Sequence, residues 1–196
     1  MKKIAIVVHG GAGPDSEFIR EHQQQYKLGI DAAVNAGYIV LESGGSAVDA
    51  VEAAVNNMED NPLFNAGRGA ALNAKAEVEM CASIMEGKTL EAGAVAIVKN
   101  VKNPVSLAKA VMQQTKHIYL GGEGALEFAR SIHLPLEPDA YFITDHAYEQ
   151  YAQMKDEMQA KGETSNPDKH GTVGAVALDR YGNVAAATST GGHRIL

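Results

Sequence analysis

The junction between Gly171 and Thr172 contains residue types that can cut their own backbone. The Thr172 hydroxyl can attack the carbonyl carbon of Gly171, which moves the acyl group from nitrogen to oxygen, and water then hydrolyses the ester. Gly171 lacks a Cβ atom and tolerates the strain of such a turn. After cleavage the α-amino group of Thr172, with a reference pKa of about 7.7–8.0, can act as base to its own hydroxyl. A Gly-Thr pair that merely begins a strand is the alternative.

A run of hydroxyl residues, Thr188-Ser189-Thr190, follows closely in the sequence. The turn sequence at 179–182 predicts a hairpin between the two segments, which brings the end of the second strand close to Thr172. Hydroxyl groups there can hydrogen-bond the nucleophile or its amine. A solvent-facing strand end rich in Ser and Thr is the alternative.

Other chemistries fit the sequence poorly. The glycines at 10–13 do not complete a G-x-G-x-x-G nucleotide loop, because Ser16 occupies the third glycine position. The histidines share no metal-ligand spacing, so we do not expect a catalytic zinc site. A single cysteine, Cys81, excludes an internal disulfide framework and a CxxC metal site.

Composition favours one soluble globular domain. The chain has 196 residues, of which 45% are hydrophobic and 21% are charged. The net charge of −7 argues against a nucleic-acid partner. The apolar run at 3–8 is too short for a signal peptide, and no stretch approaches the length of a membrane span. We therefore expect a cytoplasmic protein without a membrane partner.

The elements that must position the hydroxyl residues follow from the apolar pattern. It predicts a buried strand over 3–8 and a long helix over 16–43, then a helix that Ser46 caps and Asn61-Pro62 ends. Further along it predicts strands over 77–85 and 93–99, helices over 104–112, 123–130 and 145–162, and strands over 172–178 and 183–189. Strands and helices that occur in blocks favour an α+β fold.

Five motifs in order resemble one family. They are H-G-G-A-G after the first strand, N-P-L-F-N-A-G-x-G, E-M-x-A-S-I-M-x-G, G-T-V-G-A-V-A-L-D and A-A-T-S-T-G-G. Together, from Lys3 to Gly192, they resemble the plant-type L-asparaginase/isoaspartyl peptidase family of threonine-type N-terminal-nucleophile hydrolases. Glycosylasparaginase is the second alternative, disfavoured because its relatives usually carry Asp at the position of Gly171.

The resemblance implies an αββα four-layer sandwich, incomplete at its C-terminal side. It implies a single domain over 1–196, in which 1–171 is α-subunit-like with a mobile linker at about 162–171, and 172–196 begins a β-subunit-like segment. The implied activity is autocleavage at Gly171-Thr172, followed by hydrolysis of L-asparagine and β-aspartyl (isoaspartyl) dipeptides. No organic cofactor is implied, and a homodimer is expected.

The site residues implied by the resemblance fall into three groups. The catalytic group is Thr172, Thr190 and Thr188; the autocleavage pair is Gly171 and Thr172; the active-site wall contains Gly10, Gly11 and Asn65.

A structural sodium ion is also implied. Its ligands are the backbone carbonyl oxygens of Met58, Glu59, Asn61, Phe64, Ala66 and Arg68. Oxygen-only ligation suits a hard cation. A simple helix stop followed by a turn is the alternative for this loop.

The sequence departs from the family pattern at two places. Cys81 stands where the family has Asp, so carboxylate hydrogen bonds are lost there, and we do not expect it to act as a second nucleophile. After Gly192 the family supplies an Arg-Val-Gly-Asp segment that binds the substrate and a Thr-Gly-Thr-Gly oxyanion hole, whereas this sequence reads His193-Arg194-Ile195-Leu196. We therefore expect a truncated or misdescribed chain with weak activity or none; a fragment with only a packing or dimerisation role is the alternative. The preference between asparagine and isoaspartyl peptides stays open.

Overall fold

The computed structural model describes residues 3–13, 15–161 and 171–191. The described part contains one sheet with the strands β1 (Ala5–His9), β2 (Met80–Glu86), β3 (Ala92–Val98), β4 (Tyr119–Gly121), β5 (Val173–Leu178) and β6 (Val184–Thr190). Its helices are α1 (Glu17–Glu21), α2 (Gln23–Glu42), α3 (Ala47–Glu59), α4 (Pro104–Gln114), α5 (Gly122–Ser131), α6 (Asp139–Phe142) and α7 (Asp145–Lys161). The fold is α+β, as the sequence predicts.

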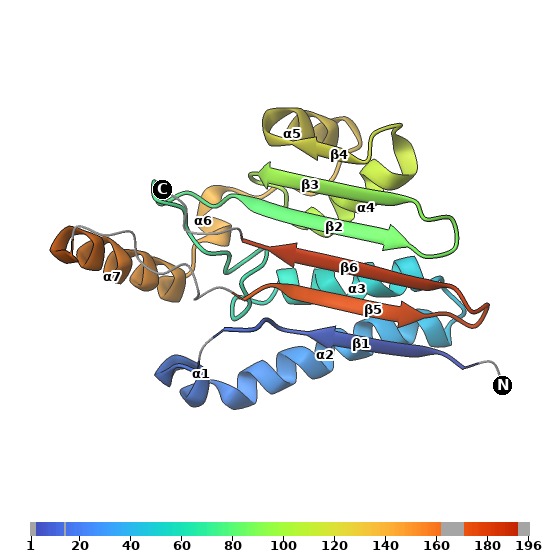
Figure 1. The fold of residues 1–196 in the computed structure, drawn as a ribbon, viewed down its shortest axis with the longest axis horizontal. Coiled ribbons are helices and arrows are strands. Elements are labelled where there is room, and N and C mark those ends of the chain that lie inside the picture. Colours follow the sequence, from blue (N-terminus) through green and yellow to red (C-terminus); the bar gives the residue numbers. More distant parts are fainter. Residues whose placement is uncertain (1–2, 14, 162–170, 192–196) are drawn as a thin grey trace.

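The last hairpin lies in the middle of the sheet. The strand order is β1-β5-β6-β2-β3-β4, so β5 and β6 are inserted between strands from the beginning and the centre of the chain (Figure 1). The neighbours are antiparallel except for β3 and β4. In this register His9 pairs with Gly174, and Cys81 pairs with Thr190. The end of β1, the start of β5 and the end of β6 therefore meet at one end of the sheet.

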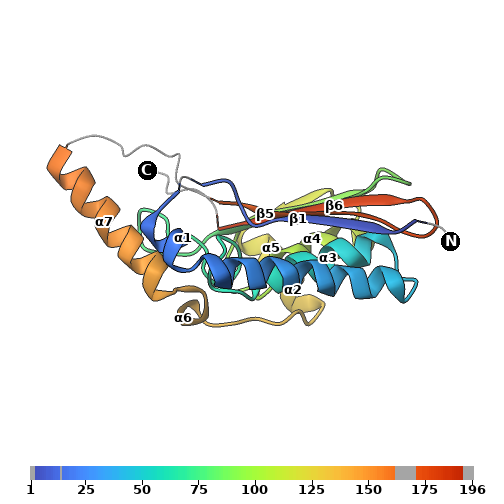
Figure 2. The same ribbon diagram turned by 90° about the horizontal axis from the view of Figure 1, so that it is seen from below.

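Helices cover one face of the sheet. Figure 2 shows α2, α3 and α4 side by side beneath it. Alternate residues of β5 and β6, such as Val173, Ala175 and Ala187, are buried on that side because successive strand residues point to opposite faces. On the other face Val7 is 69% exposed and Val176 is 53% exposed. The described residues thus form two of the four expected layers.

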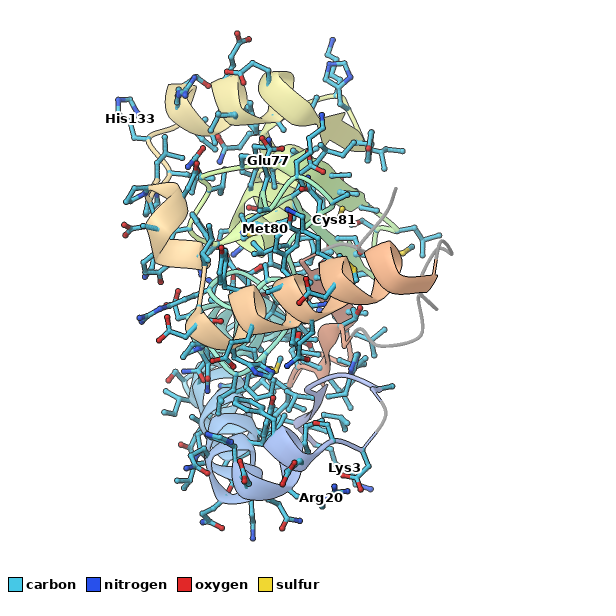
Figure 3. The ribbon with its side chains drawn as sticks, turned by 90° about the vertical axis from the view of Figure 1, so that its left-hand side faces the viewer. Lys3, Arg20, Glu77, Met80, Cys81 and His133 are labelled. Atoms are coloured by element: carbon cyan, nitrogen blue, oxygen red, sulfur yellow. The ribbon has the colours of Figure 1, made fainter. Side chains whose placement is uncertain are left out.

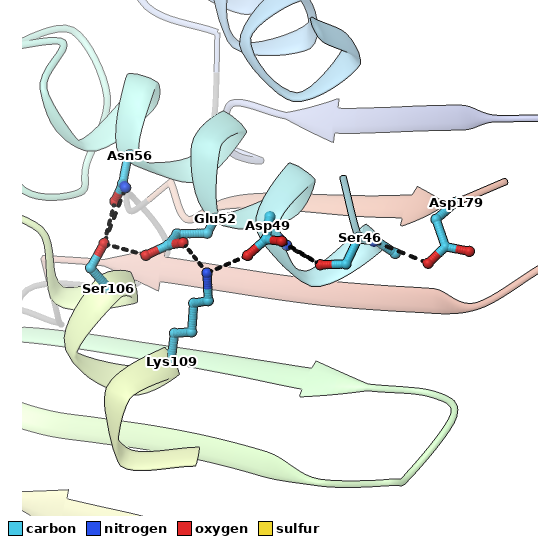
Figure 4. A network of polar contacts seen from close by, with 8 residues as sticks. Ser46, Asp49, Glu52, Asn56, Ser106, Lys109 and Asp179 are labelled. Carbon is cyan, nitrogen blue, oxygen red and sulfur yellow. Dashed lines mark hydrogen bonds and ion pairs between the residues drawn. The ribbon is translucent and has the colours of Figure 1, made fainter. Parts of the chain in front are cut away.

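Hydrogen bonds fix the helices on this face. The Ser46 hydroxyl accepts a hydrogen bond from Asp49 N (3.1 Å) and donates one to Asp49 Oδ2 (2.7 Å), which confirms the predicted cap of α3. Lys109 of α4 binds Asp49 at 2.5 Å and Glu52 at 2.6 Å (Figure 4). This half-buried network ties α3 to α4.

The helix predicted over 16–43 was wrong at one point, since it is broken at His22 into α1 and α2. The His22 ring nitrogen Nδ1 lies 2.9 Å from Phe18 O, and the Phe18 ring stacks on His22 and on His146 of α7. These ring contacts accompany a non-helical His22 backbone (φ −104°, ψ 16°). The short elements β4 and α6 were not predicted, because segments of three or four residues are too short to show a hydrophobic periodicity.

Two of the sequence-based expectations lie outside the described residues. They are the linker, of which only Gly171 is described, and the sequence from His193 to Leu196. No helix in the described part of the chain combines the length and the apolar character needed to cross a membrane.

Candidate active site

Three segments converge on the Gly171-Thr172 peptide bond. Thr172 immediately precedes β5, Thr190 is the last residue of β6, and the loop after β1 begins at Gly10. Gly171 and Thr172 are both half-buried. Figure 3 views the molecule from this end of the sheet, with α7 crossing in front.

The carbonyl oxygen of Gly171 has two donors. Asn65 Nδ2 donates to Gly171 O at 2.7 Å, and Thr190 Oγ1 lies 3.5 Å from the same oxygen. The Thr172 hydroxyl donates to Thr190 Oγ1 at 3.2 Å. The structure thus brings together the expected nucleophile, its neighbouring hydroxyl and the amide predicted to line the site.

Asn65 is itself held in place. Its Oδ1 accepts a hydrogen bond from Ala71 N (2.8 Å), which leaves Nδ2 facing Gly171. Its backbone oxygen accepts one from Gly191 N (3.1 Å). A Cβ atom on Gly191 would lie 2.5 Å from Asn65 Oδ1, so only glycine allows this approach.

The two glycines predicted to form the active-site wall, Gly10 and Gly11, lie against Phe64 and Gly171. Gly11 has φ +121°, and a Cβ atom there would lie 2.8 Å from Gly171 Cα. A Cβ atom on Gly10 would lie 2.6 Å from Phe64 Cε1. Both positions therefore need glycine for close approach, Gly11 to Gly171 and Gly10 to the ring of Phe64.

A cavity of about 430 Å³ opens beside Gly171. It lies between α1, α2, the loop after α3 and the start of α7, and its lining includes Gly11, Ser16, Tyr26, Phe64, Asn65, His146, Gln150 and Gly171. Gly171 contributes to the lining and Thr172 does not, so Thr172 does not border this cavity.

Thr188 is less closely associated with the site. It is exposed, and it pairs with Gly174 on β5 and Ser83 on β2. Among the described residues it makes no hydrogen bond to Thr172. Its catalytic role remains a prediction from the resemblance.

Cys81 lies on the strand next to Thr190. Met80 and Cys81 are adjacent on β2 (Figure 3), and Met80 is fully buried whereas Cys81 is partly exposed. Because Cys81 and Thr190 are direct cross-strand partners, their side chains share the face opposite the helices. Cys81 therefore adjoins the candidate site.

The side chain of Glu59 was missed by sequence reasoning, which used only its backbone carbonyl. The side chain is fully buried, and Oε1 accepts hydrogen bonds from Ser189 Oγ (2.6 Å) and Val105 N (3.0 Å). Burial raises the pKa of Glu59 to about 8, against the opposing effect of these hydrogen bonds. Nothing in the sequence signals this, because a glutamate at a helix end is usually solvated.

The loop predicted to bind sodium is closed by its own hydrogen bonds. Arg68 N donates to Glu59 O at 2.7 Å, and the carbonyls of Met58, Asn61 and Phe64 also accept backbone hydrogen bonds within the loop. Each carbonyl oxygen retains a second lone pair, so the donor set is compatible with a sodium ion. The same hydrogen bonds account for the shape of the loop without an ion. Among the described residues no cluster of His, Cys, Asp and Glu side chains could hold a metal.

Comparison with known proteins gives a consistent result. The model of a family described as asparaginase matches residues 2–195. The chain is 50% identical over 187 residues to an isoaspartyl peptidase/L-asparaginase of Danio rerio, and these cover 95% of this chain and 59% of the relative. It is 48% identical over 192 residues to the Homo sapiens protein of the same name (98% and 61% covered). A plant-type L-asparaginase of Pyrococcus abyssi is 46% identical over 203 residues (96% and 63% covered). The chain thus spans 59–63% of the length of these relatives.

Proposed function

The chain belongs to the asparaginase family, and from that premise we propose that it carries the cleavage site and nucleophile of a threonine-type amidohydrolase. It cuts itself between Gly171 and Thr172, and Thr172 then hydrolyses L-asparagine and β-aspartyl dipeptides. The observation that carries this proposal is the contact of Asn65 and Thr190 with the scissile carbonyl, while the Thr172 hydroxyl lies 3.2 Å from Thr190 Oγ1.

Cleavage proceeds in two steps. Thr172 Oγ attacks the carbonyl carbon of Gly171, the C–N bond breaks, and the proton passes to the new α-amino group, leaving an ester. Negative charge develops on Gly171 O during the attack, and Asn65 Nδ2 is already placed to donate to it. Water then hydrolyses the ester, giving a carboxylate at Gly171 and a free amine at Thr172.

The same residue then acts on substrates. The free amine accepts the proton of the Thr172 hydroxyl, which attacks the side-chain carbonyl carbon of the aspartyl group. The C–N bond breaks and the leaving amine takes the proton, so ammonia leaves when the substrate is asparagine and an amino acid leaves when it is a β-aspartyl dipeptide. Water then hydrolyses the β-aspartyl ester on Thr172, which releases aspartate and restores the hydroxyl. The names of the relatives supply these substrate classes. Departure of Gly171 from its place beside Gly11 would join the cavity to the nucleophile.

The decisive experiment is intact mass spectrometry of the purified chain over several days, beside a Thr172→Ala control. We expect two fragments that meet between Gly171 and Thr172 in the wild type and one uncut chain in the control. An assay with asparagine and with a β-aspartyl dipeptide follows on the cut protein. A wild-type chain that stays whole contradicts the proposed autocleavage.

Assembly and ion binding complete the proposal. We propose a homodimer with a sodium ion in the 58–68 loop, supported by the family resemblance. Light scattering at several concentrations tests the dimer. Exchange of sodium for lithium or a bulky ammonium ion tests the ion, since sodium that binds only the folded chain raises the midpoint of thermal unfolding increasingly as its concentration exceeds the Kd.

A further inference from the structure

Glu59 is a buried acid that the proposed chemistry does not use. It is the last residue of α3, and its side chain is fully buried. Oε1 accepts hydrogen bonds from Ser189 Oγ and Val105 N, while Oε2 has no hydrogen-bond partner among the described residues. Burying an apolar side chain of similar size would cost less desolvation free energy than burying a carboxyl group. The hydrogen bonds of Oε1 are therefore the feature that could give Glu59 a role at this position.

The hydrogen bond between Ser189 and Glu59 lies on the helical side of the sheet, directly next to the candidate site. Ser189 is fully buried on the helical side of β6, and Thr190 follows it on the opposite side. Ser189 also pairs with Val173, the residue after Thr172. A hydrogen bond of 2.6 Å from Ser189 Oγ to Glu59 therefore fixes the strand end one residue away from both threonines.

We propose that Glu59 is a positioning residue, which through Ser189 holds the end of β6 so that Thr190 stays within hydrogen-bonding distance of Thr172 and of the Gly171 carbonyl. The proposal concerns the Glu59 side chain, not its backbone carbonyl or its titration. It rests on the proposed function only in so far as cleavage is its readout. Val105 N, at the start of α4, also donates a hydrogen bond to Oε1. Glu59 therefore connects the end of β6 to both α3 and α4.

The first test is the rate of cleavage between Gly171 and Thr172 in the full chain. Ser189→Ala removes only the hydroxyl donor, Glu59→Met removes the acceptor, and Glu59→Gln keeps a neutral acceptor of the same shape. Leu126→Ala on α5, away from β6, is the control for a general loss of stability. We expect the rate to fall about tenfold or more in Ser189→Ala and Glu59→Met, because the donors to the carbonyl are displaced. Glu59→Gln should stay within about threefold of wild type, and Leu126→Ala should cleave normally despite a lowered melting temperature.

Two results overturn the proposal. One is normal cleavage in Ser189→Ala. The other is a set of rates that simply follows the melting temperatures, with Leu126→Ala slowed as much as Glu59→Met.

A second test works without cleavage. In the Thr172→Ala background every chain stays uncut, and amide hydrogen exchange at 188–191 reports how firmly the end of β6 is held. Ser189→Ala and Glu59→Met should speed this exchange, whereas Glu59→Gln and Leu126→Ala should not. Unchanged exchange in Ser189→Ala refutes the role of Glu59. Faster exchange together with a wild-type chain that never cleaves supports the role of Glu59 and contradicts the proposed function.

Discussion

Asn65 joins three parts of the chain through one residue. Its amide nitrogen binds the Gly171 carbonyl, its amide oxygen binds Ala71 N, and its backbone oxygen binds Gly191 N. The orientation of the donor is thus set by groups outside the reacting bond, which is what stabilising a developing charge requires.

Asn65→Asp isolates the donor. The carboxylate keeps an oxygen for Ala71 N but turns the group facing Gly171 O from a donor into a negatively charged acceptor. We expect cleavage to slow by about 10²-fold or more, with the fold retained. Intact mass spectrometry gives the rate and circular dichroism the fold; a folded variant that cleaves at the wild-type rate would contradict the assigned role.

The close approach at Gly11 gives a second prediction. Gly11→Ala forces a Cβ atom to 2.8 Å from Gly171 Cα at a positive φ, so we expect a loss of roughly 1–3 kcal/mol in folding free energy and slower cleavage. Gly13→Ala is the matched control, because a Cβ atom there meets nothing within 4 Å. Urea unfolding in the Thr172→Ala background measures the stability, and equal losses in the two variants would refute the argument.

The pKa of Glu59 gives a pH prediction. Burial raises this pKa from 4.5 to about 8, so the folded carboxyl stays neutral while the unfolded one ionises. Its contribution to stability is complete below about pH 4.5 and is lost as pH rises towards about 8. In the Thr172→Ala background, we expect the urea midpoint to fall between pH 5 and pH 8 more steeply with Glu59 than with Glu59→Gln.

The pKa values of Asp49, Glu77 and Asp179 are all held below their usual range, so these carboxyls do not obscure that slope. Burial alone would raise the pKa of Asp49, but hydrogen bonds from Lys109 and Ser46 hold it below 3.8. Its contribution is present above that range and is lost only at lower pH. Parallel curves for Glu59 and Glu59→Gln would therefore contradict the buried neutral carboxyl.

At the scale of elements, the α3 cap is a point where sequence and structure agree. Ser46→Ala removes the acceptor for Asp49 N and the donor to Asp49 Oδ2. We expect a loss of about 1 kcal/mol in folding free energy. Ser43→Ala is the matched control, because that exposed hydroxyl only donates to a carbonyl of its own helix. Urea unfolding of both variants checks this, and a larger loss in Ser43→Ala would show that the cap is not the stabilising feature.

Local patterns predicted most elements because each rests on nearby residues. The apolar period of α3, its cap and the turn before β6 are all readable from neighbouring positions. The break at His22 is not, because it accompanies the stacking of Phe18 on His146, a residue far along the chain. The short β4 exists through its pairing with β3.

The candidate site was predictable to a similar extent. The hairpin places Thr190 beside Thr172. The alternating strand pattern and one turn were therefore enough to predict that these two residues lie close together. The family resemblance predicted that Asn65 lines the site, but not its hydrogen bond to Gly171, which spans 106 positions. The burial of the Glu59 side chain could not be predicted from the sequence, because it depends on the packing of α3, α4 and β6 against one another.

At the scale of the whole molecule, chemistry and packing use opposite faces of one sheet. The helices cover the side that holds Ser189, whereas Thr190 and Cys81 share the other side. A substitution can therefore be assigned to one face from its position in the strand. Core packing depends on one set of alternating residues and the reacting groups on the other.

The central place of the β5–β6 hairpin has a consequence for the history of the molecule. The proposed cut before Thr172 would make the hairpin part of a separate polypeptide, although β1 flanks it on one side and β2 on the other. The two pieces would stay interlocked, because separation requires both ladders to break. The cut would also change the order of the folding reaction. The uncut chain folds in a unimolecular reaction, whereas the cut protein would need two polypeptides to associate. Once cleaved and denatured, the protein should therefore refold only at a rate that depends on its concentration. Because the proposed cut needs the folded chain, a cut molecule is one that has folded at least once.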